Sequence, residues 1–118
     1  MKKVVPCCPP VLHGSLSKPD AEELASLLKA LADPVRLRLL SFLAEQPEGE
    51  ACVCHVTGPM ELSQPTVSHH LKLLHDAGLL ERDKRGTWVY YRVVPERLES
   101  IREALRPRAA RPRQARRA

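Results

Sequence analysis

Leucines recur at helical intervals through the first half of the chain. Leu24, Leu28 and Leu31 are separated by four and three residues, which is the period of an amphipathic helix. A second apolar stripe follows Asp33 and Pro34, a pair that suits a helix N-cap and the first helical position. The first half of the chain therefore predicts two successive amphipathic helices.

The middle of the chain predicts two short helices joined by a tight turn. Residues 51–60 form a short third element of one or two helical turns. Ser63 then caps a fourth helix, which Gly78 ends in the left-handed conformation. The buried side of this helix is an aliphatic stripe, namely Val67, Leu71 and Leu74. Two such helices, the second with a polar face, outline a helix-turn-helix.

A hairpin and a last helix follow. Residues 79–83 and 88–93 predict two strands, with Lys84, Arg85 and Gly86 as the loop between them. In this position the hairpin is the wing of a winged helix. Residues 95–106 then predict a helix with one apolar side, which needs a partner, and a second subunit is the natural one. The predicted fold is mainly α with a small β-hairpin, a homodimeric winged helix-turn-helix.

Composition divides the chain into three parts. Prolines and a glycine exclude a long element from 1–17, so we expect a flexible arm that contains cysteines. The folded domain is predicted at 18–106, and over residues 1–106 basic and acidic residues balance at 14 each. A disordered tail at 107–118 holds five arginines and no acid, and so carries the whole net charge of +5. This tail is either a phosphate-binding arm or a solubilising extension.

Several classes of protein are excluded by what the sequence lacks. No apolar run is long enough to span a membrane, and the first residues lack the apolar core of a signal peptide. We therefore expect a cytoplasmic protein with no membrane partner. Enzymatic activity is not expected, because there is no Ser/His/Asp order and no phosphate-binding glycine loop, and the chain has only five glycines.

The polar face of the fourth helix suits the grooves of double-stranded DNA. Gln64 can pair bidentately with adenine, while hydroxyls and lysines can hold phosphates. The alternative is an ordinary solvated helix face. The predicted DNA contacts are Ser63, Gln64, Thr66, Ser68, His69 and Lys72 on the helix, with Lys84 and Arg85 at the tip of the hairpin.

Four cysteines form two close pairs, Cys7-Cys8 in the arm and Cys52-Val-Cys54 in the third element. Thiolates are soft donors that select zinc, cadmium, lead, copper(I) and trivalent arsenic or antimony. In a reducing compartment such pairs are ligands or redox groups more often than structural disulfides. Two alternatives remain, since Cys52 and Cys54 could pack in the core and the arm pair could be incidental.

These residues resemble the ArsR/SmtB family of dimeric winged-helix repressors that sense metals and metalloids. The resemblance covers roughly 20–94 and rests on 28–40 (LKALADPVRLRLL), 52–56 (CVCHV), 62–74 (LSQPTVSHHLKLL) and 78–80 (GLL). It implies a dimer that binds an operator without its ligand and releases the DNA when the ligand binds. It also implies a dimer interface from the first and last helices, here Leu24, Leu28, Leu98, Ile101 and Leu105.

The resemblance also bears on the ligand. The Cys52-Val-Cys54 pair is similar to the thiolate box of arsenite- and cadmium-sensing members, but no third cysteine follows it, so a third sulfur must come from Cys7 or Cys8. The adjacent spacing of the arm pair favours trivalent arsenic or antimony as inducer over a four-sulfur cadmium, lead or zinc site. A redox or persulfide switch, or a metal carrier without specific DNA binding, are the other hypotheses. The zinc site that some members have on the last helix is not expected, because 92–106 has no histidine.

Overall fold

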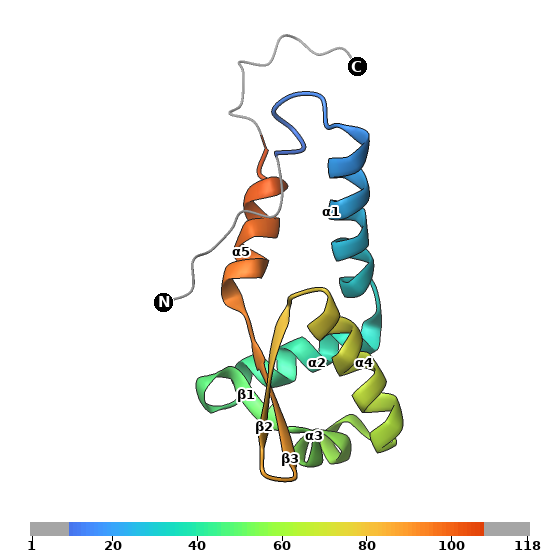
Figure 1. Cartoon of the computed structure of the whole chain (residues 1–118), viewed down its shortest axis with the longest axis vertical. Helices are drawn as coiled ribbons and strands as arrows, with labels where there is room; N and C mark the ends of the chain where they lie inside the picture. Colours follow the sequence, from blue (N-terminus) through green and yellow to red (C-terminus); the bar gives the residue numbers. More distant parts are fainter. Residues whose placement is uncertain (1–9, 108–118) are drawn as a thin grey trace, which may run out of the picture.

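Within residues 10–107 the chain forms five α-helices, one 3₁₀ turn and a small sheet (Figure 1). The computed structural model describes residues 10–107. The elements in chain order are α1 (Lys18–Leu31), α2 (Pro34–Glu45), the 3₁₀ turn η1 (Pro47–Gly49), β1 (Glu50–Cys52), α3 (Val53–Met60), α4 (Gln64–Asp76), β2 (Leu80–Arg85), β3 (Trp88–Val93) and α5 (Pro95–Ala104). The predicted fold class is confirmed, with one more strand than was expected.

Polar side chains cap the N-termini of α2 and α4, as the sequence predicted. The carboxylate of Asp33 accepts hydrogen bonds from the backbone N–H groups of Val35 and Arg36, at 2.9 and 3.1 Å, and Pro34 occupies the first position of α2. The hydroxyl of Ser63 accepts the N–H of the third residue of α4 at 3.4 Å. These bonds satisfy N–H groups that have no partner within their own helix.

The sheet is antiparallel with the strand order β1-β3-β2. Strands β2 and β3 form the wing, which projects beyond the helices (Figure 1). The predicted loop at 84–86 was wrong in one respect, because β2 continues to Arg85, which pairs with Trp88. The turn is therefore Gly86 and Thr87, and Gly86 has the positive φ of +66° that a tight two-residue hairpin turn requires.

The prediction for the third element was wrong at its start. Ala51 and Cys52 are not helical but belong to β1, where Cys52 lies opposite Tyr90 of β3. Helix α3 begins only at Val53, and Cys52 is its N-cap residue. A strand of three residues is too short to show an alternating pattern, so the sequence carried no periodic signal for it.

Leucines of α2 and α4 form the centre of the core. Leu39 and Leu43 of α2 and Leu71 and Leu74 of α4 are fully buried. Each such side chain contributes about 1.5–3 kcal/mol relative to an exposed one. This packing fixes α4 against α2 and leaves its opposite face free. Helices α1 and α5 extend together away from the tip of the wing (Figure 1).

Some predicted features lie outside the described residues. These are Cys7 and Cys8 in the arm and the arginines at 108–117 in the tail. The rest of the arm is held by the fold, since the N–H of Val11 donates to the carbonyl of Ala104 at the end of α5, at 2.9 Å. Within 10–107 no helix has the length and hydropathy that a membrane crossing requires.

Candidate nucleic-acid interface and thiol site

Helix α4 presents a polar face to the surroundings. Its aliphatic stripe is fully buried, as predicted from the sequence. Six side chains of this helix and its cap were predicted to contact DNA. Ser68 is half-buried, and the other five are exposed, namely Ser63, Gln64, Thr66, His69 and Lys72. The hydroxyl of Ser63 serves the cap of α4 and donates to Thr66 Oγ1 at 3.0 Å, so these two side chains are already partners.

Lys72 forms an ion pair one turn along the same helix. Its ammonium lies 2.9 Å from the carboxylate of Asp76, and both side chains are mostly exposed. The hydrogen bond between them raises the pKa of Lys72 and lowers the pKa of Asp76, so both groups are charged at neutral pH. Because exposed pairs of this kind are weak, the ammonium can exchange its partner for a phosphate.

A residue that the sequence analysis missed connects α4 to the rest of the fold. Arg36 Nη1 lies 3.0 Å from His70 Nδ1, and Arg36 Nε donates to the carbonyl of Ala30 at 2.6 Å. Arg36 also lowers the pKa of Asp33, first through its backbone N–H and then through its charge. One guanidinium thus joins the end of α1 and the start of α2 to the middle of α4.

The two basic residues predicted at the wing tip differ in their surroundings. Lys84 is exposed and has no ion-pair partner within 10–107. Arg85 Nη2 donates to both carboxylate oxygens of Glu50, at 3.0 and 3.2 Å, and Arg85 Nε donates to Asp83 at 2.8 Å. The guanidinium also lies 4.1 Å from the ring centroid of Tyr90. These partners raise the pKa of Arg85, first through the hydrogen bond with Asp83 and then through Glu50.

Trp88 is an exposed aromatic that the sequence analysis did not assign. Its exposed fraction is 56%, although it stands at the start of β3. Tyr91 and Val93 of the same strand are buried. The alternation along β3 therefore places Trp88 on the outer face, and the same period-two pattern could have been used to predict it.

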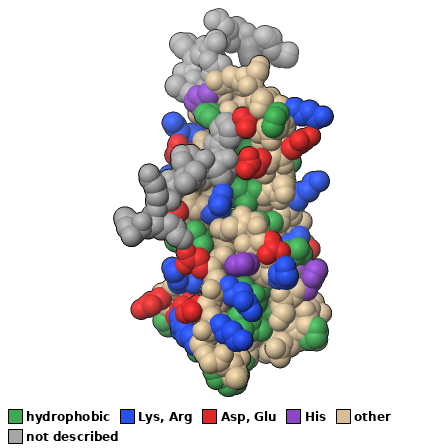
Figure 2. Space-filling model, in the orientation of Figure 1, with side chains coloured by type: hydrophobic (Ala, Val, Ile, Leu, Met, Phe, Trp, Pro, Cys, Tyr) green, Lys and Arg blue, Asp and Glu red, His purple; other side chains and the backbone are tan. Residues whose placement is uncertain are grey.

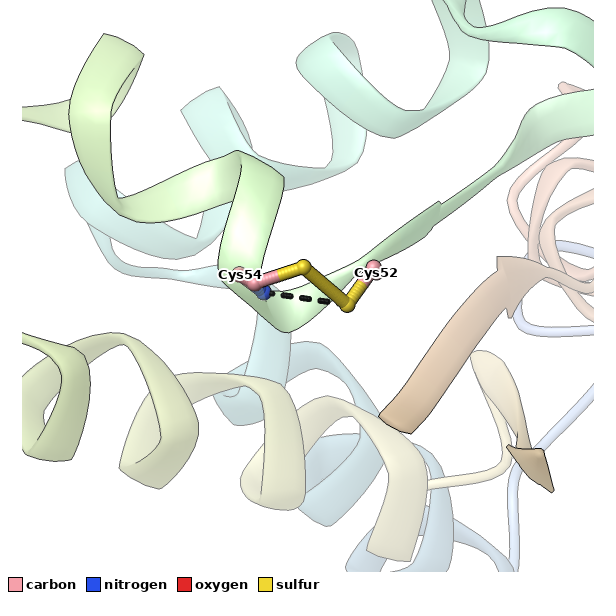
Figure 3. The surroundings of a disulfide bond; sticks show 2 residues. All are labelled: Cys52 and Cys54. Atoms are coloured by element: carbon pink, nitrogen blue, oxygen red, sulfur yellow. Dashed lines mark hydrogen bonds between the residues drawn. A yellow bond between two sulfur atoms is a disulfide. The ribbon is translucent and has the colours of Figure 1, made fainter. Parts of the chain in front are cut away.

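The cysteines of the Cys-X-Cys pair face each other across the junction of β1 and α3 (Figure 3). Their sulfur atoms are joined in a disulfide, where the sequence predicted free thiols. The Cα atoms of Cys52 and Cys54 are 5.2 Å apart, within the range of about 4.4–6.8 Å that a disulfide spans. The junction therefore holds both sulfurs on one side, and in the reduced protein the pair could hold one soft ion.

The environments of the two cysteines differ. Cys52 is buried, with 2% of its surface exposed, whereas Cys54 is exposed. The Cys52 sulfur accepts the N–H of Cys54 at 3.3 Å, in the first turn of α3. His55, considered from the sequence as a further ligand, is exposed. Within 10–107 no group of three or more His, Cys, Asp or Glu residues could hold a metal ion.

A groove of about 610 Å³ is lined by both the thiol pair and the polar face of α4. Its lining comes from the Cys-X-Cys pair, from the polar face of α4 and from the wing, and includes Cys52, Cys54, Gln64, Ser68, Lys72 and Trp88. On the face shown in Figure 2, lysines and arginines, with acidic residues among them, lie near the end of the molecule that carries the wing. Anything bound to the sulfurs would therefore lie beside the side chains that are predicted to contact DNA.

Residues 33–82 match the model of a family described as bacterial regulatory protein, arsR family. An uncharacterized HTH-type transcriptional regulator of Methanocaldococcus jannaschii is 42% identical over 68% of this chain and 88% of its own length. The chain belongs to the ArsR family. Its relatives are named as transcriptional regulators or repressors, which confirms the predictions of an ArsR/SmtB resemblance and of a non-enzymatic protein.

The names of the relatives refer to resistance to more than one element. The arsenic resistance transcriptional regulator ArsR1 of Pseudomonas putida is 49% identical over 59% of this ArsR-family chain. The match spans only 53% of that regulator's own length. A cadmium resistance transcriptional regulatory protein CadC homolog of Staphylococcus aureus is 38% identical over 75% of the chain and 71% of its own length. The relatives therefore support a response to a metal or metalloid without selecting one.

Solved structures of the family share the fold. The antimony-specific transcriptional repressor AntR is 31% identical, with a TM-score of 0.64, over 75% of this chain and 79% of its own. A homodimeric winged helix-turn-helix DNA-binding domain from Mycobacterium bovis is 28% identical, with a TM-score of 0.62, over 76% and 83%. The winged helix-turn-helix predicted for this ArsR-family protein is confirmed.

Proposed function

We propose that this protein is a transcriptional repressor that binds operator DNA as a homodimer and releases it when its thiolates bind trivalent arsenic or antimony. The observation that carries the proposal is the shared groove of Cys52, Cys54 and the polar face of α4. Release of the operator would then derepress resistance genes. In this role the protein would act in the cytoplasm, where its DNA is.

The DNA contacts that we propose follow the exposed face of α4. Gln64 stands at the first position of the helix, where side chains meet base edges in the major groove. Lys72 and Lys84 are exposed cations for phosphates, and His69 is exposed on the same helix. In a dimer the two copies of α4 would enter half-sites about 34 Å apart, one turn of DNA.

The dimer interface that we propose lies on α1, α5 and the segment before α1. Leu12 and Leu105 are large apolar side chains with 47% and 44% of their surface exposed. Leu28 and Leu98 are half-buried in the protomer, so a partner can cover the remainder. The other two predicted contacts, Leu24 and Ile101, are already buried within the single chain. The related domain from Mycobacterium bovis is described as homodimeric, which supports this arrangement.

The inducer that we propose follows from sulfur chemistry. Trivalent arsenic and antimony take three thiolates, of which Cys52 and Cys54 supply two and Cys7 or Cys8 the third. A site completed by both arm cysteines would instead suit cadmium, lead or zinc. The coupling required between the thiol site and DNA is modest, on the order of 1–3 kcal/mol.

The test is a fluorescence-anisotropy titration of the reduced protein on labelled DNA from its own promoter. Arsenite, antimonite, cadmium, lead and zinc are added separately. We expect arsenite or antimonite to release the DNA, and Cys52→Ser and Cys54→Ser to abolish release while operator binding persists. Selective release by cadmium or lead would assign a four-sulfur site. Normal release from both serine variants would contradict the proposal.

A redox switch is the second candidate function, and the disulfide between Cys52 and Cys54 favours it. Peroxide would oxidise the two thiols to the disulfide and be reduced to two waters. The same DNA assay separates the candidates. Release by peroxide with no response to arsenite would select the redox switch, whereas release by arsenite under full reduction would select the metalloid sensor.

A further inference from the structure

Arg85 joins the wing to the strand that ends at the thiol site. We propose that Arg85 is a positioning residue that holds the wing in place through its ion pair with Glu50. Through this ion pair the Cys52–Cys54 site controls the position of the wing. The part of this proposal that concerns control rests on the proposed function. It replaces the prediction that Arg85 contacts DNA.

The partners of Arg85 come from all three strands of the sheet. Glu50 begins β1, Asp83 lies in β2, and Tyr90 lies in β3 under the guanidinium. Two different nitrogens bind two carboxylates, Nη2 that of Glu50 and Nε that of Asp83, and with the stacked ring they fix the guanidinium in orientation as well as in position. Arg85 thus clamps the end of β2 to β1, a strand that otherwise pairs only with β3 in the sheet.

The strand β1 leads directly to the thiol site. It has three residues, beginning at Glu50 and ending at Cys52, and Cys52 lies opposite Tyr90 in the register with β3. Two links therefore run from Cys52 to the wing. In the first, Cys52 pairs with Tyr90 of β3, and the guanidinium of Arg85 stacks on the Tyr90 ring. The second runs along β1 from Cys52 to Glu50. A ligand that moves Cys52 would displace both links together.

The same contacts argue against a phosphate as the partner of Arg85. The side chain of Glu50 is only 19% exposed, against 46% for Arg85. If the guanidinium turned to a phosphate, a half-buried carboxylate would lose its partner beside a second negative charge, which is unfavourable. Lys84, next to Arg85, has no ion pair with a carboxylate within the described residues, so it is the better phosphate contact.

The salt dependence of operator binding tests the role of Arg85. Removing a phosphate contact lowers the slope of log K against log salt by about one, whereas removing a positioning residue weakens binding at an unchanged slope. We expect Lys84→Ala to lower the slope. Arg85→Ala and Glu50→Gln should both weaken binding about two- to fivefold, the effect of one partly exposed ion pair, with the slope of the wild type. A lowered slope for Arg85→Ala, with wild-type binding by Glu50→Gln, would overturn the proposal.

Trp88 reports the state of the wing directly. It is the only tryptophan in the chain, and it lies opposite Arg85 in the hairpin. Arsenite is titrated into the reduced, DNA-free protein, and thiolate–arsenic absorbance confirms binding in each variant. We expect Trp88 fluorescence to respond in the wild type and the response to shrink at least twofold in Glu50→Gln. The matched control is Glu99→Gln, which removes a carboxylate that pairs with Arg102 on α5, outside the sheet.

The outcomes separate this inference from the proposed function. An equal response of Trp88 in the wild type and Glu50→Gln would overturn the control of the wing through β1, because a direct effect of bound arsenite on the nearby indole does not require Glu50. Failure of arsenite to bind the wild type would instead contradict the proposed function, and the salt series would still decide the role of Arg85.

Discussion

Arg36 Nη1 lies 3.0 Å from His70 Nδ1, and this contact joins two helices whose residues are 34 positions apart in the chain. The same guanidinium reaches back to the carbonyl of Ala30. The contact therefore fixes α4, the proposed reading helix, relative to α1 and α2. If α4 rotated by a fraction of a turn, Gln64 would no longer meet the base edge that we propose it contacts.

Arg36→Ala is expected to destabilise the protein and weaken operator binding together. Loss of the guanidinium leaves a half-buried carbonyl and imidazole without their donor, a cost of about 1–3 kcal/mol. Urea unfolding measures the stability and anisotropy measures the binding. Arg38→Ala is the matched control, because Arg38 is exposed on the same helix. Equal stability of the two variants would show that the contact with His70 contributes nothing.

Asp33→Asn is expected to remove part of the pH dependence of stability. Hydrogen bonding from the backbone of Arg36, followed by the charges of Arg36 and His70, lowers the pKa of Asp33 below its ordinary value of 3.8. The charged carboxylate therefore stabilises the folded state above the unfolded pKa, and this stabilisation is lost as pH falls through the lower folded pKa. Urea midpoints of wild type and Asp33→Asn should differ at pH 7 and converge in acid. A constant difference at all pH values would refute the assignment.

Gly78→Ala is expected to destabilise the protein by about 1–2 kcal/mol. Gly78 follows α4 with a φ of +81°, and an added Cβ would lie 2.8 Å from Arg97 Nη2. The arginine tip can move, so most of the cost comes from the backbone conformation. Gly58→Ala is the control, since Gly58 lies within α3 with open space around it and should be neutral or stabilising. Thermal unfolding of both variants checks the contrast.

Leu105→Glu is expected to convert the proposed dimer to a monomer. A carboxylate in place of an apolar side chain would be buried without a partner in the interface. Light scattering after size-exclusion chromatography gives the mass. Leu37→Glu is the control, because Leu37 is 53% exposed on α2, apart from the proposed interface. A dimeric Leu105→Glu, or a monomeric Leu37→Glu, would place the interface elsewhere.

The sequence was informative where a pattern repeats within one element. Caps at Asp33 and Ser63, the stripe on α4 and the wing strands could all be predicted, because each signal lies within a few residues. The Cys-X-Cys pair was recognised for the same reason. Its position beside the reading helix was an inference from order along the chain, and the groove now supports it.

Contacts between distant segments could not be predicted in this way. Nothing local to Arg36 indicates His70, and nothing local to Arg85 indicates Glu50, 35 positions earlier. A basic residue near a hairpin tip was therefore interpreted by its charge alone, as a DNA contact. Pairing of β1 with β3 was missed because a three-residue strand has too few positions to show a period.

The unequal exposure of the two sulfurs sets an order of events at the junction of β1 and α3. An incoming thiol or soft ion meets Cys54 first, because Cys52 is almost completely covered. When a reductant attacks the outer sulfur, the inner one departs as a thiolate, and the N–H of Cys54 at the start of α3 stabilises that charge. We therefore expect the rate of capture to be governed by Cys54, and the step that strains the sheet to come second, when Cys52 engages.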